Sequence, residues 1–522
     1  MNLATLAEQN LREFGEYERL VFEEQRFTNR ALYEMSRKLC AGLERLGLRA
    51  DDKVVVLLRN CPEVLVSYPA IWRAGCVVIP VLFLLDKREI SYILKNSETK
   101  AIITSPDLLD KVRLALDGAT SVKHIILTGS SAEGTPESQV SAGAVELVSF
   151  ERLIAEHEPQ VGHVARSDSD LAVILYTSGT TGAPKGVMQT HRNLYAAVMN
   201  SHASQPRRNH NITSLLVLPL AHSFGLGVLI GGYLFAGKAI LMRWFDPEEA
   251  LHLIEKHKVQ GMAGVPTMFV YMLNHPNAHG YDTSSIERWL VGGAPMPVEQ
   301  QLQIEKQFGG TMYVGYGLTE SCPGLSGDRE GYPRKPGSCG LVHEGVELKI
   351  IDEQGLSVAR GEPGEICARG QNISPGYYRM PEQTAETFRD GWLHTGDIGY
   401  LDEDGYLFVV ERKKDLIIRG GFNVYPKDVE EALSTHPAVL ECAVVGVPDP
   451  VMGEEVCAFV VKKREASVTA EELIGHCRAQ LARYKTPKQV EFVEALPKTN
   501  IGKVQKKELR RLAQTMRQEL RH

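Results

Sequence analysis

The sequence lacks any cysteine arrangement that could bind a metal or build a disulfide framework. Its nine cysteines include no C-x-x-C pair, and their number is odd. This pattern argues against a zinc ribbon and against a disulfide scaffold. It favours a reducing compartment, so we expect a cytoplasmic protein.

Excess positive charge and long apolar segments are also missing. The formal net charge of -7 gives no reason to expect a nucleic-acid partner. Residues 1–20 contain no apolar run of the kind found in secretory signals. The most apolar stretch, residues 214–237, is interrupted by Pro219, His222 and several glycines. We therefore expect a buried strand and a core helix there, and no transmembrane segment.

The pattern of apolar residues predicts an α/β protein. The chain has 522 residues, enough for two to four domains. Strand-like runs at 53–58 and 76–81 flank a helical pattern at 62–74. Such alternation predicts mainly parallel sheets covered by helices. From about 340 to 411, short strands separated by Gly and Asp turns predict a small antiparallel, barrel-like region. A charged break at 411–415 precedes a tail with its own α+β alternation, large enough for a domain.

The most informative segment is 176–187, rich in Gly, Ser and Thr around one Lys, directly after the strand-like run 171–175. Glycines let the backbone approach an anion, while hydroxyls, amides and lysine donate hydrogen bonds to phosphate oxygens. The segment is not a Walker P-loop, because Pro184 stands where the second Gly should be and Gly186 follows Lys185. The predicted phosphate contacts are Thr177, Ser178, Gly179, Thr180, Thr181, Gly182 and Lys185.

This loop resembles the signature of the adenylate-forming enzymes, which include acyl-CoA ligases, luciferases and peptide-synthetase adenylation domains. Further motifs similar to those of the family recur in family order, at 292–295, 316–320, 395–397, 420–426 and 497–503. The resemblance implies ATP, Mg²⁺, CoA and a small carboxylic acid as ligands. It also implies an N-terminal domain at 1–411, a hinge at 412–414 and a small mobile C-terminal domain at 415–522.

The same resemblance assigns roles at the nucleotide. In the family, the tyrosine at the position of Tyr316 stacks on adenine, and the glutamate at Glu320 binds Mg²⁺, a hard cation that prefers carboxylate oxygen. Asp397 and Arg412 match the two ribose contacts, and a carboxylate can accept from both hydroxyls. The nucleotide contacts implied in addition to the phosphate loop are Gly293, Ala294, Pro295, Tyr316, Gly317, Thr319, Asp397 and Arg412.

Lys503 matches the family's catalytic lysine. Its positive charge would offset the negative charge that builds as a carboxylate attacks a phosphate. Thr319 and Glu320 complete the catalytic set that the resemblance implies. Lys414 occupies the hinge position, where a few residues absorb a domain rotation. The resemblance assigns the lining of a CoA tunnel to Gly420, Gly421 and Phe422.

The segments expected to wall the acyl pocket contain no Arg or Lys, which argues against a dicarboxylate substrate. Aliphatic and aromatic monocarboxylates both stay open, and the apolar walls favour a fatty acid. The predicted pocket residues are His222, Phe224, Gly264, Gly293, Gly315 and Cys322.

The sequence therefore predicts an AMP-forming acyl-CoA ligase. The alternatives are an aryl-acid CoA ligase, a stand-alone adenylation enzyme that loads a carrier protein, a luciferase, or a nucleotide-binding regulator without catalysis. An amino-acid adenylation domain would usually place an Asp at the start of the pocket, where this chain has Ala221 and His222. A regulator is disfavoured because Glu320, Asp397, Arg412 and Lys503 occur together. The oligomeric state is not encoded, and a homodimer stays open.

Overall fold

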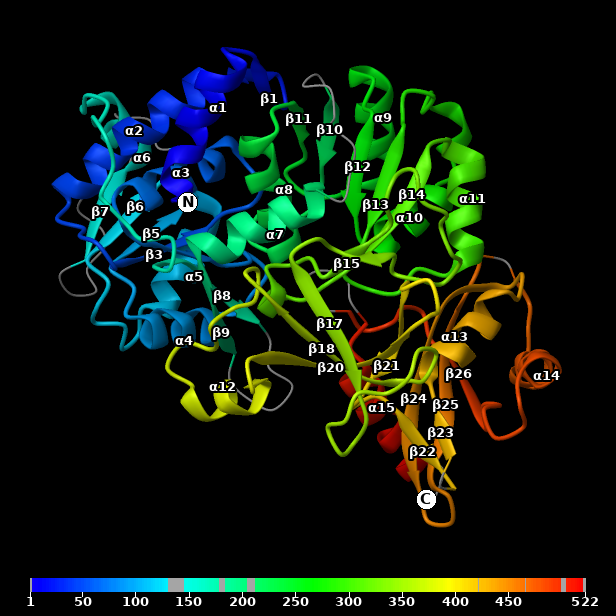
Figure 1. The fold of residues 1–522 in the computed structure, drawn as a ribbon. Coiled ribbons are helices and arrows are strands. Elements are labelled where there is room, and N and C mark those ends of the chain that lie inside the picture. The colour runs from blue at the N-terminus through cyan, green and yellow to red at the C-terminus, as the bar shows by residue number, and fades with distance from the viewer. Residues whose placement is uncertain are drawn as a thin grey trace.

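The computed structural model describes residues 2–129, 145–177, 184–203, 212–420, 422–464, 466–498 and 504–519, without the side chains of 517–519. The chain forms two large helix-covered sheets, a smaller antiparallel sheet between them and the C-terminal part, and a small C-terminal α+β unit (Figure 1). This arrangement is the predicted α/β fold.

The first large sheet is built from the early part of the chain. Its strand order is β7-β6-β5-β3-β4-β8-β9, parallel except for the pair β8–β9. Along β3, Val54 and Val56 face one helical layer, while Val55 and Leu57 face the other, because side chains alternate across a strand. The strands are β3 Lys53–Leu57, β4 Val77–Pro80, β5 Ala101–Thr104, β6 His124–Leu127, β7 Glu146–Ser149, β8 Leu171–Thr177 and β9 Lys185–Thr190. The covering helices are α2 Asn29–Arg45, α3 Pro62–Arg73, α4 Lys87–Ser97, α5 Pro106–Ala115 and α6 Phe150–Ala155.

The second large sheet has the order β16-β15-β14-β13-β12-β10-β11-β1-β2, and its central strands from β14 to β1 are parallel. The strands are β1 Glu18–Phe22, β2 Gln25–Thr28, β10 Thr213–Leu216, β11 Lys238–Leu241, β12 Gly261–Gly264, β13 Arg288–Val291, β14 Thr311–Tyr316, β15 Ser326–Gly327 and β16 Leu341–Val342. The associated helices are α1 Leu6–Phe14, α7 His191–Ala203, α8 Ser223–Leu234, α9 Pro247–His257, α10 Pro266–Leu273 and α11 Val298–Phe308, with short turns at η1 Leu3–Thr5 and η2 Ala278–Gly280.

The apolar stretch 214–237 folds as predicted, into strand β10 and helix α8. Leu226, Leu229 and Ile230 of α8 are fully buried in the core. Within the part of the chain that the structure describes, no helix is both long and apolar enough to cross a bilayer.

The predicted barrel-like region is an open antiparallel sheet of five strands. Strand β20 is its centre, because β18, β19 and β21 all pair with it. The elements are β17 Val346–Ile351, β18 Gly364–Gly370, α12 Pro381–Thr387, β19 Phe388–Arg389, β20 Trp392–Leu401 and β21 Leu407–Arg412.

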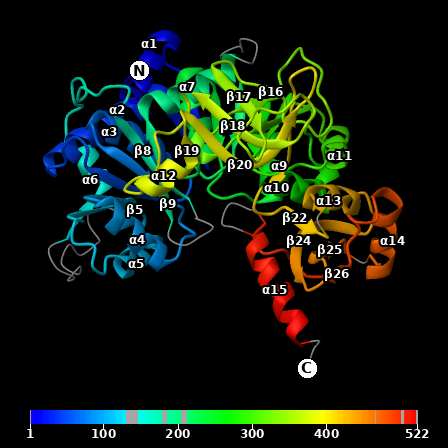
Figure 2. The ribbon, with the colours of Figure 1, turned by 60° about the horizontal axis from the view of Figure 1, so that its bottom comes forward.

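The C-terminal part has its own sheet and its own hydrophobic clusters. Figure 2 shows it beside the end of the second large sheet, next to α10 and α11. Its elements are β22 Ile417–Arg419, β23 Phe422–Val424, α13 Pro426–Ser434, β24 Val439–Asp449, β25 Gly453–Lys462, α14 Ala470–Gln480, β26 Gln489–Phe492 and α15 Lys506–Glu519. A separate core fits the predicted domain, whose boundaries stay a prediction.

Candidate active site

The ends of the predicted phosphate loop come together in the hairpin β8–β9. Thr177 pairs with Lys185 across the hairpin, and the Thr177 hydroxyl donates to the Lys185 carbonyl at 3.5 Å. The predicted contacts Ser178, Gly179, Thr180, Thr181 and Gly182 lie outside the described residues. Backbone pairing thus places the two described phosphate contacts, Thr177 and Lys185, opposite each other on neighbouring strands.

Tyr377, a residue that sequence reasoning missed, contacts both Glu320 and Lys185. The Tyr377 hydroxyl donates to Glu320 Oε1 at 2.8 Å, and Lys185 Nζ lies 4.8 Å from the centre of the Tyr377 ring. Burial, and then the Glu320 charge, raise the pKa of Tyr377, so the phenol stays a neutral donor. Tyr377 therefore orients the carboxylate that is predicted to bind the metal.

The backbone around Glu320 is fixed from both sides. Glu320 lies in the short turn η3, Thr319–Ser321. Gln189 Nε2 donates to the Thr319 carbonyl at 2.9 Å, and the Ser374 amide donates to the Glu320 carbonyl at 2.8 Å. These bonds join η3 to β9 of the first large sheet and to the segment that carries Tyr377.

The chemistry at Glu320 fits Mg²⁺ better than a metal held by protein ligands alone. Among the described residues, no group of three or more His, Cys, Asp or Glu could hold a metal ion. Mg²⁺ keeps several waters and is bound by one or two carboxylates together with substrate phosphates. Glu320, with one oxygen accepting from Tyr377 and the other without a described partner, is suited to this role.

The two predicted ribose contacts, Asp397 and Arg412, form a cluster with Tyr316, the predicted adenine contact. Tyr316 ends β14, Asp397 lies in β20, and Arg412 faces Asp397 from β21. The Tyr316 hydroxyl donates to Asp397 Oδ2 at 2.7 Å, and Arg412 Nε lies 3.0 Å from Asp397 Oδ1. Burial, and then Asp397, raise the pKa of Tyr316 well above its usual value. Each carboxylate oxygen keeps a lone pair for a further donor.

Two glycines of the predicted nucleotide loops, Gly317 and Gly293, are constrained in different ways. A Cβ at Gly317 would overlap the carbonyl oxygen of Pro323. Gly293 has φ of +83°, a conformation that glycine adopts at no steric cost. After Gly293 come the partly buried Ala294 and the exposed Pro295. Gly317 thus lies against the backbone at Pro323, whereas the approach of an adenine ring to Gly293 stays a prediction.

The predicted acyl-pocket glycines lie at the ends of adjacent parallel strands. The Gly292 amide donates to the Gly264 carbonyl at 3.3 Å, and a Cβ at Gly292 would lie 3.2 Å from the Gly315 carbonyl. The same Cβ would lie 3.5 Å from the Phe224 ring. His222 caps the N-terminus of α8, and its Nδ1 accepts from the Phe224 amide at 3.3 Å. The structure thus brings Phe224, Gly264 and Gly315 around Gly292.

Cys322 is fully buried, with φ of +57°. Burial, and then the charge of Glu320, raise the pKa of its thiol. A buried thiol of this kind is expected to pack as an apolar group. Its neighbour Pro323 approaches α8 instead, since a Cβ at Gly227 would lie 3.2 Å from Pro323 Cδ.

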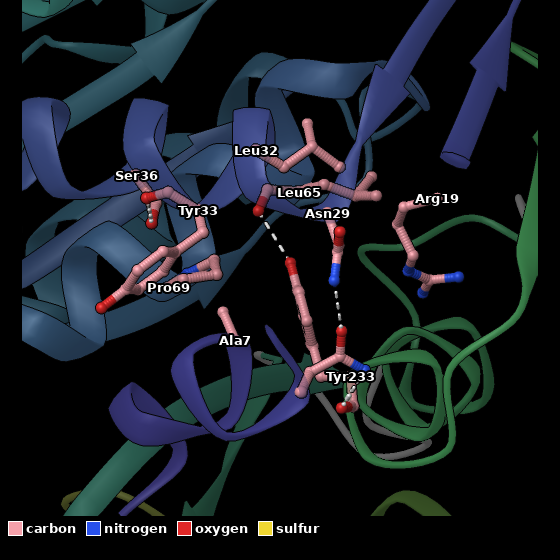
Figure 3. A pocket seen from close by; sticks show the side chains of 10 residues that line it. Ala7, Arg19, Asn29, Leu32, Tyr33, Ser36, Leu65, Pro69 and Tyr233 are labelled. Atoms are coloured by element: carbon pink, nitrogen blue, oxygen red, sulfur yellow. Dashed lines mark hydrogen bonds between the residues drawn. The ribbon is translucent and has the colours of Figure 1, made fainter. Parts of the chain in front are cut away.

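The far end of α8 is held by polar side chains around a small separate cavity (Figure 3). The Tyr233 hydroxyl donates to the Leu65 carbonyl at 2.8 Å, and Asn10 Nδ2 donates to the Tyr233 carbonyl at 2.9 Å. Arg19 Nη1 donates to the Gly237 carbonyl at 2.9 Å, and a cation at this end of a helix is favoured by the helix dipole. These contacts fix the helix whose other end carries His222.

The tail carries the remaining predicted residues. Lys414 lies exposed in the turn after β21, where the Asp415 amide donates to the Arg412 carbonyl at 2.9 Å. Gly420 has φ of +57°, and its amide donates to the Met452 carbonyl at 2.7 Å. Phe422 is exposed and lies 5.1 Å from the Tyr484 ring. Gly421 and Lys503 lie outside the described residues.

A predicted nucleotide site where a large α/β sheet meets the antiparallel sheet, followed by a tail with its own core, is typical of the adenylate-forming enzymes. Residues 7–378 match the AMP-binding enzyme family, and residues 428–503 match the AMP-binding enzyme C-terminal domain. The chain belongs to the AMP-binding enzyme family. The predicted family and fold class are confirmed.

Individual proteins of this family are similar to the chain over nearly its whole length. A long-chain-fatty-acid–CoA ligase of Bacillus subtilis (strain 168) is 38% identical, over 90% of this chain and 87% of the relative. The anthranilate CoA ligase AuaEII, solved with anthranoyl-AMP, has a TM-score of 0.92 at 28% identity, covering 99% of this chain and 98% of that chain. The o-succinylbenzoate CoA synthetase MenE of Bacillus subtilis, solved with ATP and magnesium, has a TM-score of 0.81 at 28% identity, covering 96% and 98%.

Proposed function

We propose that this protein is an AMP-forming acyl-CoA ligase that activates a long-chain fatty acid. The similarity to a long-chain-fatty-acid–CoA ligase over 90% of the chain carries this proposal. The apolar helix α8, whose Phe224 lies beside Gly292, supports it, because a long acyl chain needs an apolar wall without charge. All nine cysteines are free thiols, which supports the proposed cytoplasmic location.

In the first half-reaction, an oxygen of the substrate carboxylate attacks the α-phosphorus of ATP, and the bond to pyrophosphate breaks. We assign ribose binding to Asp397 and Arg412, and phosphate binding to Thr177, Lys185 and Thr319 with the loop between β8 and β9. Glu320, oriented by Tyr377, would hold Mg²⁺, which supplies charge neutralisation at the phosphates. Lys503 would offset the charge that develops between carboxylate and phosphate.

In the second half-reaction, the CoA sulfur attacks the acyl carbon, AMP leaves, and the thiol proton passes to solvent. Dividing the substitution into two steps makes each easier, because AMP is a better leaving group than oxide. We propose that the tail turns about Lys414 between the steps and brings Gly420, Gly421 and Phe422 to the thiol. The exposure of Lys414 and Phe422 leaves both free for such a movement.

An aryl acid is the second candidate substrate. The anthranilate CoA ligase with a TM-score of 0.92 favours it. The described pocket-wall residues carry no lysine or arginine, so both candidates are monocarboxylates. Burying an unpaired second carboxylate would cost several kcal/mol.

The deciding experiment measures pyrophosphate release and thioester formation with fatty acids of increasing length, aryl acids, and the α,ω-dicarboxylic analogue of the best fatty acid. We expect the largest kcat/KM for a long fatty acid and a value roughly a thousandfold lower for its dicarboxylic analogue. A preference for an aryl acid would select the second candidate. A preference for the dicarboxylate would overturn the charge argument.

The role of Lys503 is tested by Lys503→Ala in separate half-reactions. Adenylation should fall by orders of magnitude, whereas thioester formation from supplied acyl-adenylate should persist. Equal loss of both steps in a folded variant would refute the role.

A further inference from the structure

Lys498 lies in the tail, far from the hinge in the sequence, and connects the tail to the N-terminal part. Its Nζ donates to the Tyr271 hydroxyl oxygen at 3.0 Å and to the two carboxylate oxygens of Glu441 at 2.7 and 2.8 Å. The same Nζ lies 5.0 Å from the centre of the Tyr271 ring. Glu441 belongs to β24 of the tail, whereas Tyr271 belongs to α10 of the N-terminal part.

Tyr271 lies near the predicted acyl pocket, and Lys498 borders the segment that contains Lys503. Tyr271 lies about one helical turn from Met268, whose sulfur would lie 3.5 Å from a Cβ at Gly264, a predicted pocket residue. Lys498 pairs with Val504 in an isolated β-bridge, and Gln505 Nε2 donates to the Lys498 carbonyl at 2.6 Å. Lys498 and Val504 are the described residues on either side of 499–503, the segment in which Lys503 lies.

The remaining described hydrogen bonds between the two parts lie beside the hinge. Lys427 Nζ donates to the Val409 carbonyl at 2.7 Å, and Lys506 Nζ donates to Glu411 Oε2 at 3.3 Å. Val409 and Glu411 precede the hinge by only a few residues, so a rotation there moves them little relative to the tail. A contact at Tyr271 is much more sensitive to the angle of the tail.

We propose that Lys498 is a positioning residue for adenylation, acting through its contact with Tyr271. The contact stabilises the tail orientation of the structure, which we assign to adenylation because Lys498 borders the segment that contains Lys503. The contact must break before the tail turns for thioester formation. Glu441 holds the ammonium in place within the tail in either orientation. This inference rests on the proposed two-step function, and no covalent chemistry is assigned to Lys498 itself.

The geometry favours a switchable contact over a purely structural one. Lys498 and Glu441 side chains are 18% and 14% exposed, whereas Tyr271 is 44% exposed. The pair within the tail is therefore largely withdrawn from water. The bond to Tyr271 is close to solvent, so water can replace it at little cost when the tail turns.

The test uses Tyr271→Phe in the full chain, because this change removes only the hydroxyl and keeps the ring. Adenylation, measured as pyrophosphate release in single turnover, should fall about three- to tenfold. Thioester formation from supplied acyl-adenylate should stay within about twofold of wild type. Lys498→Met should lower adenylation further, and the double variant should lose less than the product of the single effects, because both changes remove one contact.

Tyr281→Phe is the matched control. The Tyr281 hydroxyl also makes a hydrogen bond to a charged side chain near the surface of the N-terminal part, donating to Glu248 at 3.2 Å. No contact between Tyr281 and the tail occurs among the described residues. The Tyr281→Phe variant should leave the rates of both half-reactions unchanged. Equal loss of both steps in Tyr271→Phe, or strictly multiplicative effects with Lys498→Met, would overturn the inference.

Hydrogen–deuterium exchange gives a readout that does not depend on activity. Amides of α10 and of the segment before Lys498 should exchange faster in Tyr271→Phe than in wild type or Tyr281→Phe. Unchanged exchange would show that the contact does not hold the tail. Failure of the proposed function is distinguishable, since it would appear as a wild-type protein that forms neither acyl-adenylate nor thioester.

Discussion

Replacing Tyr377 with phenylalanine isolates one hydrogen bond at the predicted metal ligand. The hydroxyl donates to Glu320 Oε1 at 2.8 Å, while the ring separately contacts Lys185. Phenylalanine keeps the ring and its contact and removes only the donor. Because Tyr377 is 5% exposed, solvent replaces the lost donor poorly. Glu320 would then lose the group that fixes its rotamer.

The size of the effect follows from the charge on Glu320. A hydrogen bond to an ionised group contributes about 1.5–3 kcal/mol net. We take this loss to apply when Glu320 holds Mg²⁺ on the reacting phosphates. Because 1.36 kcal/mol corresponds to a factor of ten in rate, adenylation should then slow about 10- to 150-fold. Thioester formation needs no such metal contact and should change little. The apparent affinity for Mg²⁺ should fall together with the rate.

Tyr406→Phe provides a closely matched control. Tyr406 is also 5% exposed, has a lysine 4.6 Å from its ring centre, and donates its hydroxyl at 2.6 Å. Its acceptor is the Pro333 carbonyl, however, and not a carboxylate. The assay is pyrophosphate release titrated with Mg²⁺ at saturating ATP. If Tyr377→Phe slows adenylation no more than Tyr406→Phe does, the metal-orienting role is refuted.

Three further predictions test other parts of the molecule. Gly315→Val should shorten the longest acid accepted, because a Cβ there meets only the Ser326 carbonyl at 3.7 Å, and an unchanged chain-length profile would contradict the pocket placement. Lys414→Pro should preserve adenylation and lower CoA transfer, since proline fixes φ, whereas equal losses would show that the hinge lies elsewhere. Burial, and then Arg329, lower the pKa of His343 to about 4, so the unfolded chain binds the extra proton and stability falls from pH 6.5 towards pH 4. Urea unfolding should show that His343→Gln loses about 2 kcal/mol less than wild type between pH 7 and pH 5, and equal losses would refute the assignment.

The sequence predicts much of the fold because local patterns decide it. The run 53–58 alternates between two buried faces, and that pattern requires helices on both sides of the strand. The apolar stretch 214–237 could be assigned to strand and helix because proline and glycines interrupt it. The open, branched form of the antiparallel sheet could not be predicted. It depends on β20 pairing with three strands, which short runs of alternating residues do not specify.

The site shows a similar division between what motifs reveal and what packing adds. The spacing of Asp397 and Arg412 in the sequence has a structural cause. Strands β20 and β21 form a hairpin in which these two residues are directly paired. Tyr377 and Tyr271 lie outside the motifs that identified the family. The role that we propose for each depends on a side chain distant in sequence, Glu320 for Tyr377 and Lys498 for Tyr271. No periodicity or spacing could have signalled either contact.

Tyr316 shows how one motif residue can connect parts that the sequence presents separately. Its ring was assigned to adenine from the resemblance, and its hydroxyl is found on Asp397, the predicted ribose ligand. The bond crosses from β14 of the second large sheet to β20 of the antiparallel sheet, and Arg412 on the same carboxylate is the first residue of the predicted hinge. A nucleotide held by Tyr316, Asp397 and Arg412 would therefore contact both sheets and the base of the tail. The buried carboxylate of Asp397 thus receives both the Tyr316 hydroxyl and the Arg412 guanidinium, and Arg412 is the last residue of the antiparallel sheet before the tail.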